Sequence, residues 1–478
     1  MKDHVYEKVY LGGDWHEPRA KGAVEVVNPS TERVIGSVPE VSSEDVDEAV
    51  HLARDAWADW AALPPSERAS FAASIASHLR QHRDELVELV IGEVGSPRGL
   101  TERVQVDAAI DVFASMPGLV NEVTFEERVG DSVVLREPIG VVGAITPWNY
   151  PLLQIAFKVA PALTAGCTVV LKPSEVTPLN AFVLAQAIHT SDIPAGVFGL
   201  VTGPGPTVGE ALASHRLLDM VSFTGSTRAG SRVAALASAT PAKTTLELGG
   251  KSPTVLLDDL VGPELQRAVE AAVRGAFPNS GQNCGALSRL LVSQGQLAEV
   301  ERLAVQAAER LKVGDPTEPS TDIGPLVSQS QRDRVRSYIL SGIEEGARLL
   351  TGGPDAPVGL PRGYFVKPTV FSDVTRRMRI AREEIFGPVL AILPYEGDDE
   401  AVSLANDTEY GLSAAVRGAD AERARRVAER IRAGQVLVND GHRTNYTPFG
   451  GFKLSGYGRE GGRYGLEEFL TPKALHLP

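Results

Sequence analysis

Short apolar runs alternate with segments of helical periodicity through the middle of this 478-residue chain. Such alternation predicts βαβ units, in which helices cover both faces of a parallel sheet. The runs expected to form strands are Val141–Ile145, Thr168–Leu171, Val197–Val201, Met220–Phe223 and Thr245–Leu248. A second alternating region after residue 253 predicts a second α/β domain. Its helices are expected near 264–276, 295–311 and 420–433, and its strands near 288–293, 388–394 and 435–439.

The two ends of the chain carry different patterns. Apolar residues at helical spacing from Val46 to Trp60 predict an amphipathic helix with Ser43 as its N-cap, and a second helix is expected after Pro65. Residues 125–138 alternate around a Gly-Asp pair and predict a strand, a turn and a strand. The segment Pro472–Leu477 predicts another short strand. We therefore expect two α/β domains and a small β element.

Composition and charge narrow the possible partners and location. The formal net charge of −14 argues against nucleic-acid and anionic-membrane partners, which both require a basic surface. The first residues lack the apolar core of a secretory signal, and Pro147, Pro151 and Lys158 interrupt the longest apolar stretch, so no membrane span is predicted. Two cysteines in a chain of this length are no disulfide framework, which favours a reducing cytoplasm.

One of the two cysteines lies in a setting suited to chemistry. Cys284 belongs to FPNSGQNCGALSR, where polar and glycine residues break the preceding helical pattern. Cys167 instead opens the apolar run CTVVL and is expected to be buried and inert. A nucleophilic thiol needs exposure, a lowered pKa and a route to its substrate. From this segment alone, nucleophile and bystander are equally good interpretations of Cys284.

Two further polar residues follow predicted strands. Glu247 in TLELGGKSP stands at a strand end, on the side of an α/β sheet where ligands bind. Asn149 in ITPWNYP is flanked by prolines that restrict the backbone and would hold its amide in one direction. An exposed strand-end carboxylate and an ordinary Asx turn are the alternative interpretations.

Seven segments together resemble one family. ITPWNYP, LKPSE, FTGST, LELGGKSP, FPNSGQNC, EEIFGPV and PFGGFKLSGYGRE occur in the order and near the spacing of the NAD(P)-dependent aldehyde dehydrogenase superfamily, from VNPST at residues 27–31 to the C-terminus. The resemblance implies an aldehyde dehydrogenase-like α/β fold with a Rossmann-like cofactor domain, a catalytic domain and a β oligomerisation element. The domain boundaries expected are 1–120 with 139–250 for the cofactor domain, 251–455 for the catalytic domain, and 121–138 with 456–478 for the oligomerisation element.

The resemblance also implies a role for each polar residue. The Cys284 thiolate would attack an aldehyde, and the Asn149 amide and the Cys284 backbone N–H would donate to the resulting oxyanion. Hydride would pass to the nicotinamide and leave a thioester, which water activated by Glu247 would hydrolyse. Lys158 and Glu460 match positions that relay the proton to solvent, and a structural ion pair is the alternative interpretation of these two.

The cofactor segments lack the GxGxxG of ordinary Rossmann proteins. GPGPTVG at 203–209 is a weak match and is expected to be a turn into a helix, whereas Ser226 in FTGSTRAG is expected to start a helix whose N–H groups meet the pyrophosphate. Lys172 and Glu175 would hold the adenine ribose, which favours NAD and leaves NADP possible. No metal site is predicted. The complete predicted cofactor set is Thr146, Pro147, Trp148, Lys172, Ser174, Glu175, Gly205, Gly209, Phe223, Gly225, Ser226, Leu248, Glu384 and Phe386.

Three other readings of the chain compete with a hydrolytic dehydrogenase. Relatives that pass the acyl group to coenzyme A generally lack the glutamate found at 247, so Glu247 favours water as the acceptor. A catalytically silent relative should have lost Cys284, Glu247 or Asn149, and all three are present. A cysteine hydrolase would need a histidine base, yet none of the nine histidines lies in a segment suited to catalysis.

The substrate and the assembly are less defined by the sequence. His442 and Arg443 suit a polar or anionic aldehyde or are solvated loop residues. The resemblance implies a homodimer or a homotetramer formed through the 125–138 hairpin and the C-terminal strand. Residues expected to line the substrate pocket are Tyr150, Leu153, Phe277, Asn283, Gly285 and the loop Asp440–Tyr446.

Overall fold

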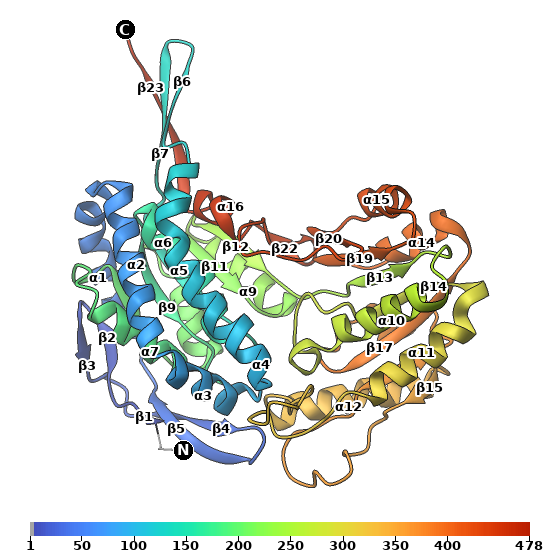
Figure 1. Ribbon diagram of the computed structural model, residues 1–478. Helices are drawn as coiled ribbons and strands as arrows, with labels where there is room; N and C mark the ends of the chain where they lie inside the picture. The colour runs from blue at the N-terminus through green and yellow to red at the C-terminus, as the bar shows by residue number, and fades with distance from the viewer. Residues whose placement is uncertain (1–3) are drawn as a thin grey trace.

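The computed structural model describes residues 4–478, and Figure 1 shows two α/β lobes with a long β-arm rising from the first. An eight-stranded sheet forms the centre of the first lobe. Its order is β22 (Gly456–Tyr457), β12 (Lys243–Glu247), β11 (Met220–Thr224), β8 (Val141–Ile145), β9 (Thr168–Lys172), β10 (Phe198–Leu200), β2 (Val9–Leu11) and β3 (Asp14–His16). The predicted strands β8 to β12 are confirmed and run parallel, whereas β22 and β2 join antiparallel.

Helices bury both faces of this sheet. One face packs against α2, α3, α5, α6 and α7, and the other against α1, α8 and α9. Every residue of β8 is buried, because alternate side chains point into these two layers. The bounds are α1 (Ser43–Ala62), α2 (Pro65–Gln81), α3 (Arg83–Val94), α4 (Arg98–Leu100), α5 (Ala108–Leu119), α6 (Pro151–Ala165), α7 (Leu179–His189), α8 (Glu210–Ala213) and α9 (Thr227–Ala237).

The first predicted helix is confirmed, but its predicted cap is wrong. Ser42, not Ser43, is the N-cap of α1, because the Ser42 hydroxyl accepts from the Asp45 N–H at 3.2 Å. An Asp45 carboxylate oxygen accepts from the Ser42 N–H at 2.9 Å, and this second bond completes a capping box. Trp60 is 1% exposed and packs in the core, as expected from its position on the apolar face.

A seven-stranded sheet forms the centre of the second lobe. Its order is β15 (Arg348–Thr351), β16 (Thr369–Ser372), β17 (Val389–Tyr395), β14 (Arg289–Ser293), β13 (Pro253–Leu256), β19 (Ser413–Arg417) and β20 (Gln435–Val438). The predicted strands and helices of this region are confirmed, although α15 ends at Glu429 instead of 433. Its helices are α10 (Gly262–Ala276), α11 (Leu297–Glu309), α12 (Gln329–Glu344), α13 (Arg379–Arg382), α14 (Gly397–Asn406) and α15 (Ala421–Glu429).

The β-arm joins both predicted β segments. Strand β7 (Ser132–Pro138) lies between β6 (Glu126–Val129) and β23 (Leu470–His476), and all three are antiparallel. Figure 1 shows the arm leaving the first lobe beside α16 (Gly462–Glu467), with the C-terminus at its tip. The remaining small sheets pair β1 (His4–Val5) and β4 (Ala23–Asn28) with β5 (Arg33–Pro39), and β18 (Tyr410–Gly411) with β21 (Phe452–Lys453).

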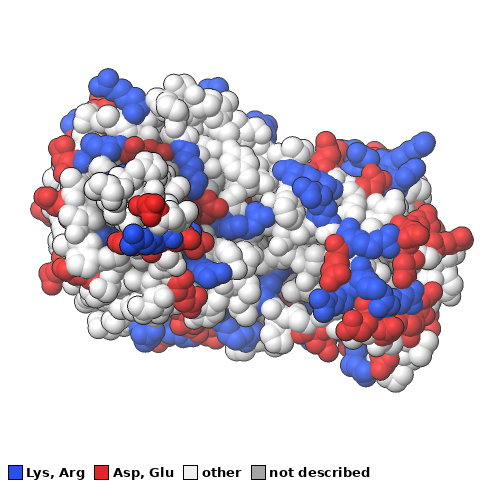
Figure 2. Space-filling view, turned by 90° about the horizontal axis from the view of Figure 1, so that it is seen from above, with Lys and Arg blue, Asp and Glu red and all other residues white. Residues whose placement is uncertain are grey.

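Three further observations bear on the sequence predictions. Cys167 is fully buried, as expected, and burial raises the pKa of its thiol to about 11. Between residues 4 and 478, none of the helices combines the length and apolar character needed to cross a bilayer. Figure 2 shows basic and acidic side chains interspersed over the face seen from above. The exact domain boundaries stay a prediction.

Candidate active site

Cys284 is carried by an irregular turn at the end of α10. Asn279, Ser280 and Gly281 all adopt left-handed backbone angles, with φ of 52°, 59° and 75°. The Ser280 hydroxyl donates to the Gly324 carbonyl at 2.9 Å, and the Gln282 side-chain oxygen accepts from the Val327 N–H at 2.8 Å. Tertiary contacts of this kind hold a backbone that non-glycine residues otherwise disfavour. The turn presents the thiol in a fixed position.

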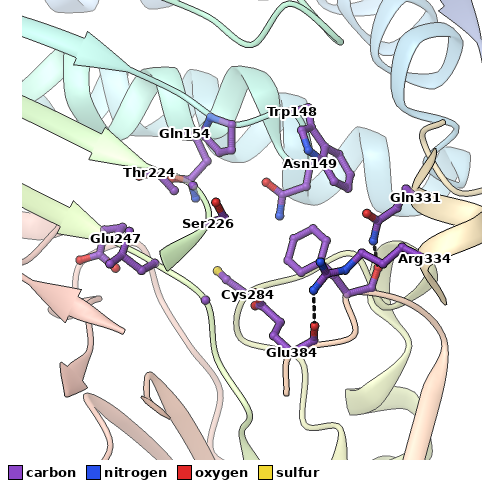
Figure 3. A pocket seen from close by; sticks show the side chains of 15 residues that line it. Trp148, Asn149, Gln154, Thr224, Ser226, Glu247, Cys284, Gln331, Arg334 and Glu384 are labelled. Carbon is purple, nitrogen blue, oxygen red and sulfur yellow. Dashed lines mark hydrogen bonds between the residues drawn. The ribbon is translucent and has the colours of Figure 1, made fainter. Parts of the chain in front are cut away.

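The thiol points into a cavity of about 190 Å³ that both lobes line. Figure 3 shows Asn149 directly across from Cys284. The Asn149 side-chain amide donates to the Gln282 backbone carbonyl at 3.1 Å. The Asn149 backbone carbonyl accepts from the Asn279 side-chain amide at 2.8 Å. An amide nitrogen has two hydrogens, so one N–H remains for a ligand beside the sulfur. The predicted pairing of Asn149 with Cys284 is geometrically in place.

Glu247 ends β12 in the wall of the same cavity. Its carboxylate is turned away from Cys284 (Figure 3) and lies against the backbone of Gly450. The residue is 4% exposed, and neither carboxylate oxygen has a hydrogen-bond partner among residues 4–478. Burial and the neighbouring Glu460 raise the pKa of Glu247, while Lys158 lowers it. A carboxyl group with a raised pKa and no fixed partner is suited to proton transfer.

A buried polar chain lies behind Glu247. Lys158 donates to a Glu460 carboxylate oxygen at 2.6 Å and to the Ser222 hydroxyl at 3.2 Å. The Thr245 hydroxyl, two residues before Glu247 on β12, donates to Ser222 at 3.0 Å. Lys158 and Glu460 therefore form the ion pair that the sequence left as an alternative, and they lie outside the cavity lining.

The thiol of the chain by itself lacks one property of a nucleophile. A nucleophilic thiol needs a lowered pKa, but burial and the carboxylates of Glu384 and Glu247 raise the pKa of the Cys284 thiol to about 12. Arg443 lowers the pKa by a smaller amount. The pKa is raised because the cavity is desolvated and holds more negative than positive charge.

Glu384 is held by the two glycines that follow Leu248. Its carboxylate accepts from the Gly250 N–H at 2.9 Å, and a Cβ on Gly249 would lie 2.3 Å from its other oxygen. Burial raises the pKa of Glu384 to about 7. Arg334 donates to the Glu384 carbonyl at 2.8 Å (Figure 3). A buried acid without a cation partner is positioned to accept hydrogen bonds from hydroxyl groups of a ligand.

The remaining cofactor predictions form two further clusters. Ser226 is the N-cap of α9, and its hydroxyl accepts from the Ala229 N–H at 3.3 Å. Lys172 pairs with Glu175 at 2.9 Å, and Glu175 also accepts from the Gly205 N–H at 3.3 Å. A helix N-terminus suits a phosphate, and a half-exposed carboxylate suits ribose hydroxyls. These residues and the Glu384 pocket together fit a dinucleotide.

The cavity unites most of the predicted site and adds to it. Trp148 and Phe386 meet edge to face there, with ring centroids 5.3 Å apart. The predicted residues in its lining are Pro147, Trp148, Asn149, Gly225, Ser226, Glu247, Leu248, Cys284, Glu384 and Phe386. Those outside the lining are Thr146, Lys158, Lys172, Ser174, Glu175, Gly205, Gly209, Phe223 and Glu460. Lining residues that sequence reasoning missed are Gln154, Thr224, Gly249, Gln331 and Arg334.

Some of these omissions had a signal in the sequence, and others had none. Thr224 lies within FTGST and Gly249 within LELGGKSP, two segments already singled out. Gln331 and Arg334 lie on α12 in a polar helix that carries no motif, and only the fold brings them to the cavity. Phe277, expected to line the substrate pocket, is instead 2% exposed and packs in the core of the second lobe.

Comparison with known proteins shows which proteins the whole chain is similar to. The sequence profile described as the aldehyde dehydrogenase family matches residues 15–475. A 3-succinoylsemialdehyde-pyridine dehydrogenase from a Pseudomonas species is 46% identical over 99% of both chains. The crystal structure of a Pseudomonas syringae aldehyde dehydrogenase C mutant with NAD+ and octanal has a TM-score of 0.97 and 47% identity, covering 99% of this chain and 97% of that one. A Mycobacterium tuberculosis aldehyde dehydrogenase with NAD+ has a TM-score of 0.97 and 40% identity, covering 100% of this chain and 99% of that one.

Proposed function

The chain belongs to the aldehyde dehydrogenase family and is an NAD-dependent enzyme that oxidises an aldehyde to a carboxylic acid; within that reaction, we propose that Cys284 is the nucleophile and Glu247 the base. One observation supports this assignment above the others. A cysteine, an amide with a spare N–H and an unpartnered buried carboxyl group line one cavity. Acyl transfer through a cysteine needs these three functions.

In the first step, the Cys284 sulfur bonds to the aldehyde carbon and the carbonyl electrons move to its oxygen. Asn149 and the Cys284 backbone N–H donate to that oxyanion. Glu247 takes the thiol proton, which requires its side chain to rotate toward the sulfur from the position in Figure 3. NAD, when bound, supplies the hydride acceptor that oxidises the thiohemiacetal to a thioester.

Before the second step, Glu247 passes the thiol proton on and becomes a carboxylate again. It then removes a proton from water, whose oxygen attacks the thioester. The C–S bond breaks, and the product leaves as a carboxylic acid while the sulfur regains a proton. Lys158, Glu460 and Ser222 lie behind Glu247 and would relay the proton to solvent. Glu247 thus favours water over coenzyme A as the acyl acceptor.

Single-turnover measurements on Glu247→Gln test this assignment. The variant should form about one equivalent of NADH per site if the thiol can still be deprotonated by solvent, and then stop as a thioester on Cys284, which mass spectrometry detects. Cys284→Ala should give neither NADH nor adduct. Glu383→Gln is a matched control, because Glu383 is bonded to Tyr338 and Arg379 outside the cavity lining. Unchanged steady-state turnover of Glu247→Gln, or acyl-CoA as the product when coenzyme A is added, would contradict the proposal.

For the cofactor, we propose Lys172 and Glu175 as the adenine-ribose contacts and Ser226 as the phosphate contact. Glu384 and Phe386 would position the nicotinamide end, with Gln331 and Arg334 beside them. The Glu175 carboxylate would repel a 2′-phosphate, which supports NAD over NADP. The other predicted contacts lie around these residues: Thr146 donates its N–H to the Lys172 carbonyl at 3.1 Å, and Gly205 donates to Glu175.

The β-arm supports a further proposal on assembly. It projects from the first lobe (Figure 1), and both outer strands, β6 and β23, present mostly exposed residues. Edge strands of this kind pair with a second chain, so we propose a homodimer or a pair of dimers. A reducing compartment such as the cytoplasm would keep the Cys284 thiol free.

A further inference from the structure

Arg443 lies outside the cofactor cavity lining, beside the residue that follows Cys284. Its guanidinium donates to the Ser413 hydroxyl at 2.8 Å and to the Gly285 carbonyl at 3.3 Å. A Cβ on Gly285 would lie only 2.8 Å from Arg443 Nη1. The residue after the nucleophile must therefore be small for the guanidinium to occupy this place. The loop Asp440–Tyr446 thus carries a positive charge to the residue that adjoins Cys284.

The charge of Arg443 is not neutralised by a neighbouring acid. Across the described part of the chain, residues 4–478, no carboxylate lies within 4.0 Å of its guanidinium, whereas Arg417 beside the same loop pairs with Asp440 at 3.1 Å. Partial burial lowers the pKa of Arg443, and the Cys284 thiol and the Tyr150 hydroxyl raise it. The residue as a whole is exposed, while its hydrogen bonds are part-buried. An unpaired guanidinium that solutes can reach is a ready site for a carboxylate.

Tyr150 supplies a second donor at the same place. The residue is 7% exposed, and its hydroxyl oxygen accepts from the Asn283 side chain at 3.3 Å. The Asn283 side-chain oxygen is occupied by the Gly285 N–H at 2.8 Å. No group among residues 4–478 accepts from the Tyr150 hydroxyl, so its hydrogen is left to donate. The hydroxyl interacts electrostatically with both Cys284 and Arg443. The Arg443 guanidinium and the Tyr150 hydroxyl are thus two donors at one positively charged place, and together they match the two oxygens of a carboxylate.

We propose that Arg443, assisted by the Tyr150 hydroxyl, binds the distal carboxylate of an ω-oxo acid and makes acidic semialdehydes the preferred substrate class. The inference rests on the proposed function, because the aldehyde end must reach Cys284. Since the guanidinium packs on Gly285, the residue next to Cys284, the carbon spacer between aldehyde and carboxylate is short. Arg443 is a specificity residue and takes no part in the bond changes.

The test compares two aldehydes with the same carbon count, 4-oxobutanoate and butanal, by kcat/KM from NADH formation. The wild-type enzyme should prefer 4-oxobutanoate. Arg443→Met should lower the ratio of the two kcat/KM values by about 10- to 100-fold, the size expected for losing a hydrogen-bonded ion pair, and Arg443→Lys should lower it less. Any effect of Arg443 on the thiol acts on both substrates and cancels in the ratio. His442→Ala, in the neighbouring exposed residue, should leave the ratio unchanged.

A binding measurement gives an independent readout. Succinate, which carries the same carboxylate, should slow modification of Cys284 by a thiol reagent in the wild type and fail to do so in Arg443→Met. A ratio that Arg443→Met does not change, or a wild type that prefers butanal, would overturn the substrate inference while butanal oxidation still supports the proposed function. Absence of NADH from both aldehydes would instead overturn the proposed function, and this inference with it.

Discussion

The raised pKa of Cys284 makes a quantitative prediction for the thiol of the enzyme without cofactor. Raising the pKa from the ordinary value of 9.0 to about 12 lowers the thiolate fraction at pH 8 by about 1,000-fold. A more basic thiolate is also more nucleophilic, which recovers about 20-fold for a Brønsted slope near 0.45. Disulfide exchange at Cys284 should therefore be roughly 50-fold slower than for an unperturbed thiol.

The assay measures mixed-disulfide formation with hydroxyethyl disulfide by mass spectrometry, in a Cys167→Ala background, from pH 7 to 10. Because the pH stays well below the pKa throughout, the rate should rise about tenfold per pH unit without a plateau. A plateau below pH 9, or a rate faster than that of free cysteine at pH 8, would refute the reasoning. Either result would mean that the Cys284 thiol is already ionised in the resting enzyme.

The same assay separates the two causes of the raised pKa. Burial raises the pKa of Glu384 to about 7, so its carboxyl group is charged mainly above pH 7. Glu384→Gln removes that charge, lowers the pKa of Cys284, and should speed the exchange above pH 7 while the rates converge below it. Glu383→Gln, whose carboxylate is bonded to Tyr338 and Arg379, should match the wild type. Equal rates for all three proteins at pH 9 would exclude the Glu384 carboxylate as a cause of the raised pKa.

Three further predictions concern other parts of the molecule. Glu175→Gln should raise kcat/KM for NADP by about tenfold or more relative to NAD, because it removes the carboxylate that would repel a 2′-phosphate; steady-state kinetics with both cofactors measures it. Arg68→Met should lower the free energy of unfolding by about 3 kcal/mol in urea titrations, because four carbonyls, those of Ala61, Leu63, Thr164 and Ala165, lose their donor. Deleting residues 471–478 should reduce the molar mass in light scattering, since β23 would be lost from the arm; an unchanged mass would exclude the arm as an interface.

The two central sheets could be predicted because their physics is local to the sequence. A strand that is buried on both faces must be apolar throughout, so the apolar run Val141–Ile145 alone predicts such a strand. The cap of α1 had a signal in the sequence that the prediction of Ser43 missed, because Asp45 stands three residues after Ser42, the spacing of a capping box, whereas Val46 stands three residues after Ser43. The antiparallel edge strand β22 has two residues and no pattern to detect.

The candidate site was predictable in its chemistry and not in its electrostatics. Motif segments placed Cys284, Asn149 and Glu247, and the fold gathers all three in one cavity. Arg334 reaches that cavity from a helix without a motif. The pKa of the Cys284 thiol depends on desolvation and on the carboxylates of Glu247 and Glu384, which are 37 and 100 residues away in sequence. Because only folding brings these groups together, the sequence alone does not show their combined effect on the pKa.

The raised pKa values of Cys284 and Glu247 have one consequence for how the site is built. Glu247 must be ionised to take the thiol proton, so the transfer moves one negative charge from its carboxylate to the sulfur inside a desolvated cavity, where an unpaired charge is costly. Among the cations that act on these groups are Arg443 for the thiol and Lys158 for the carboxyl group, one from each lobe. The negative charge is therefore stabilised by Lys158 before the transfer and by Arg443 after it. The two lobes therefore have complementary roles. The second lobe holds the nucleophile Cys284 and the cation Arg443, and the first holds the base Glu247 and the polar chain that would relay its proton to solvent.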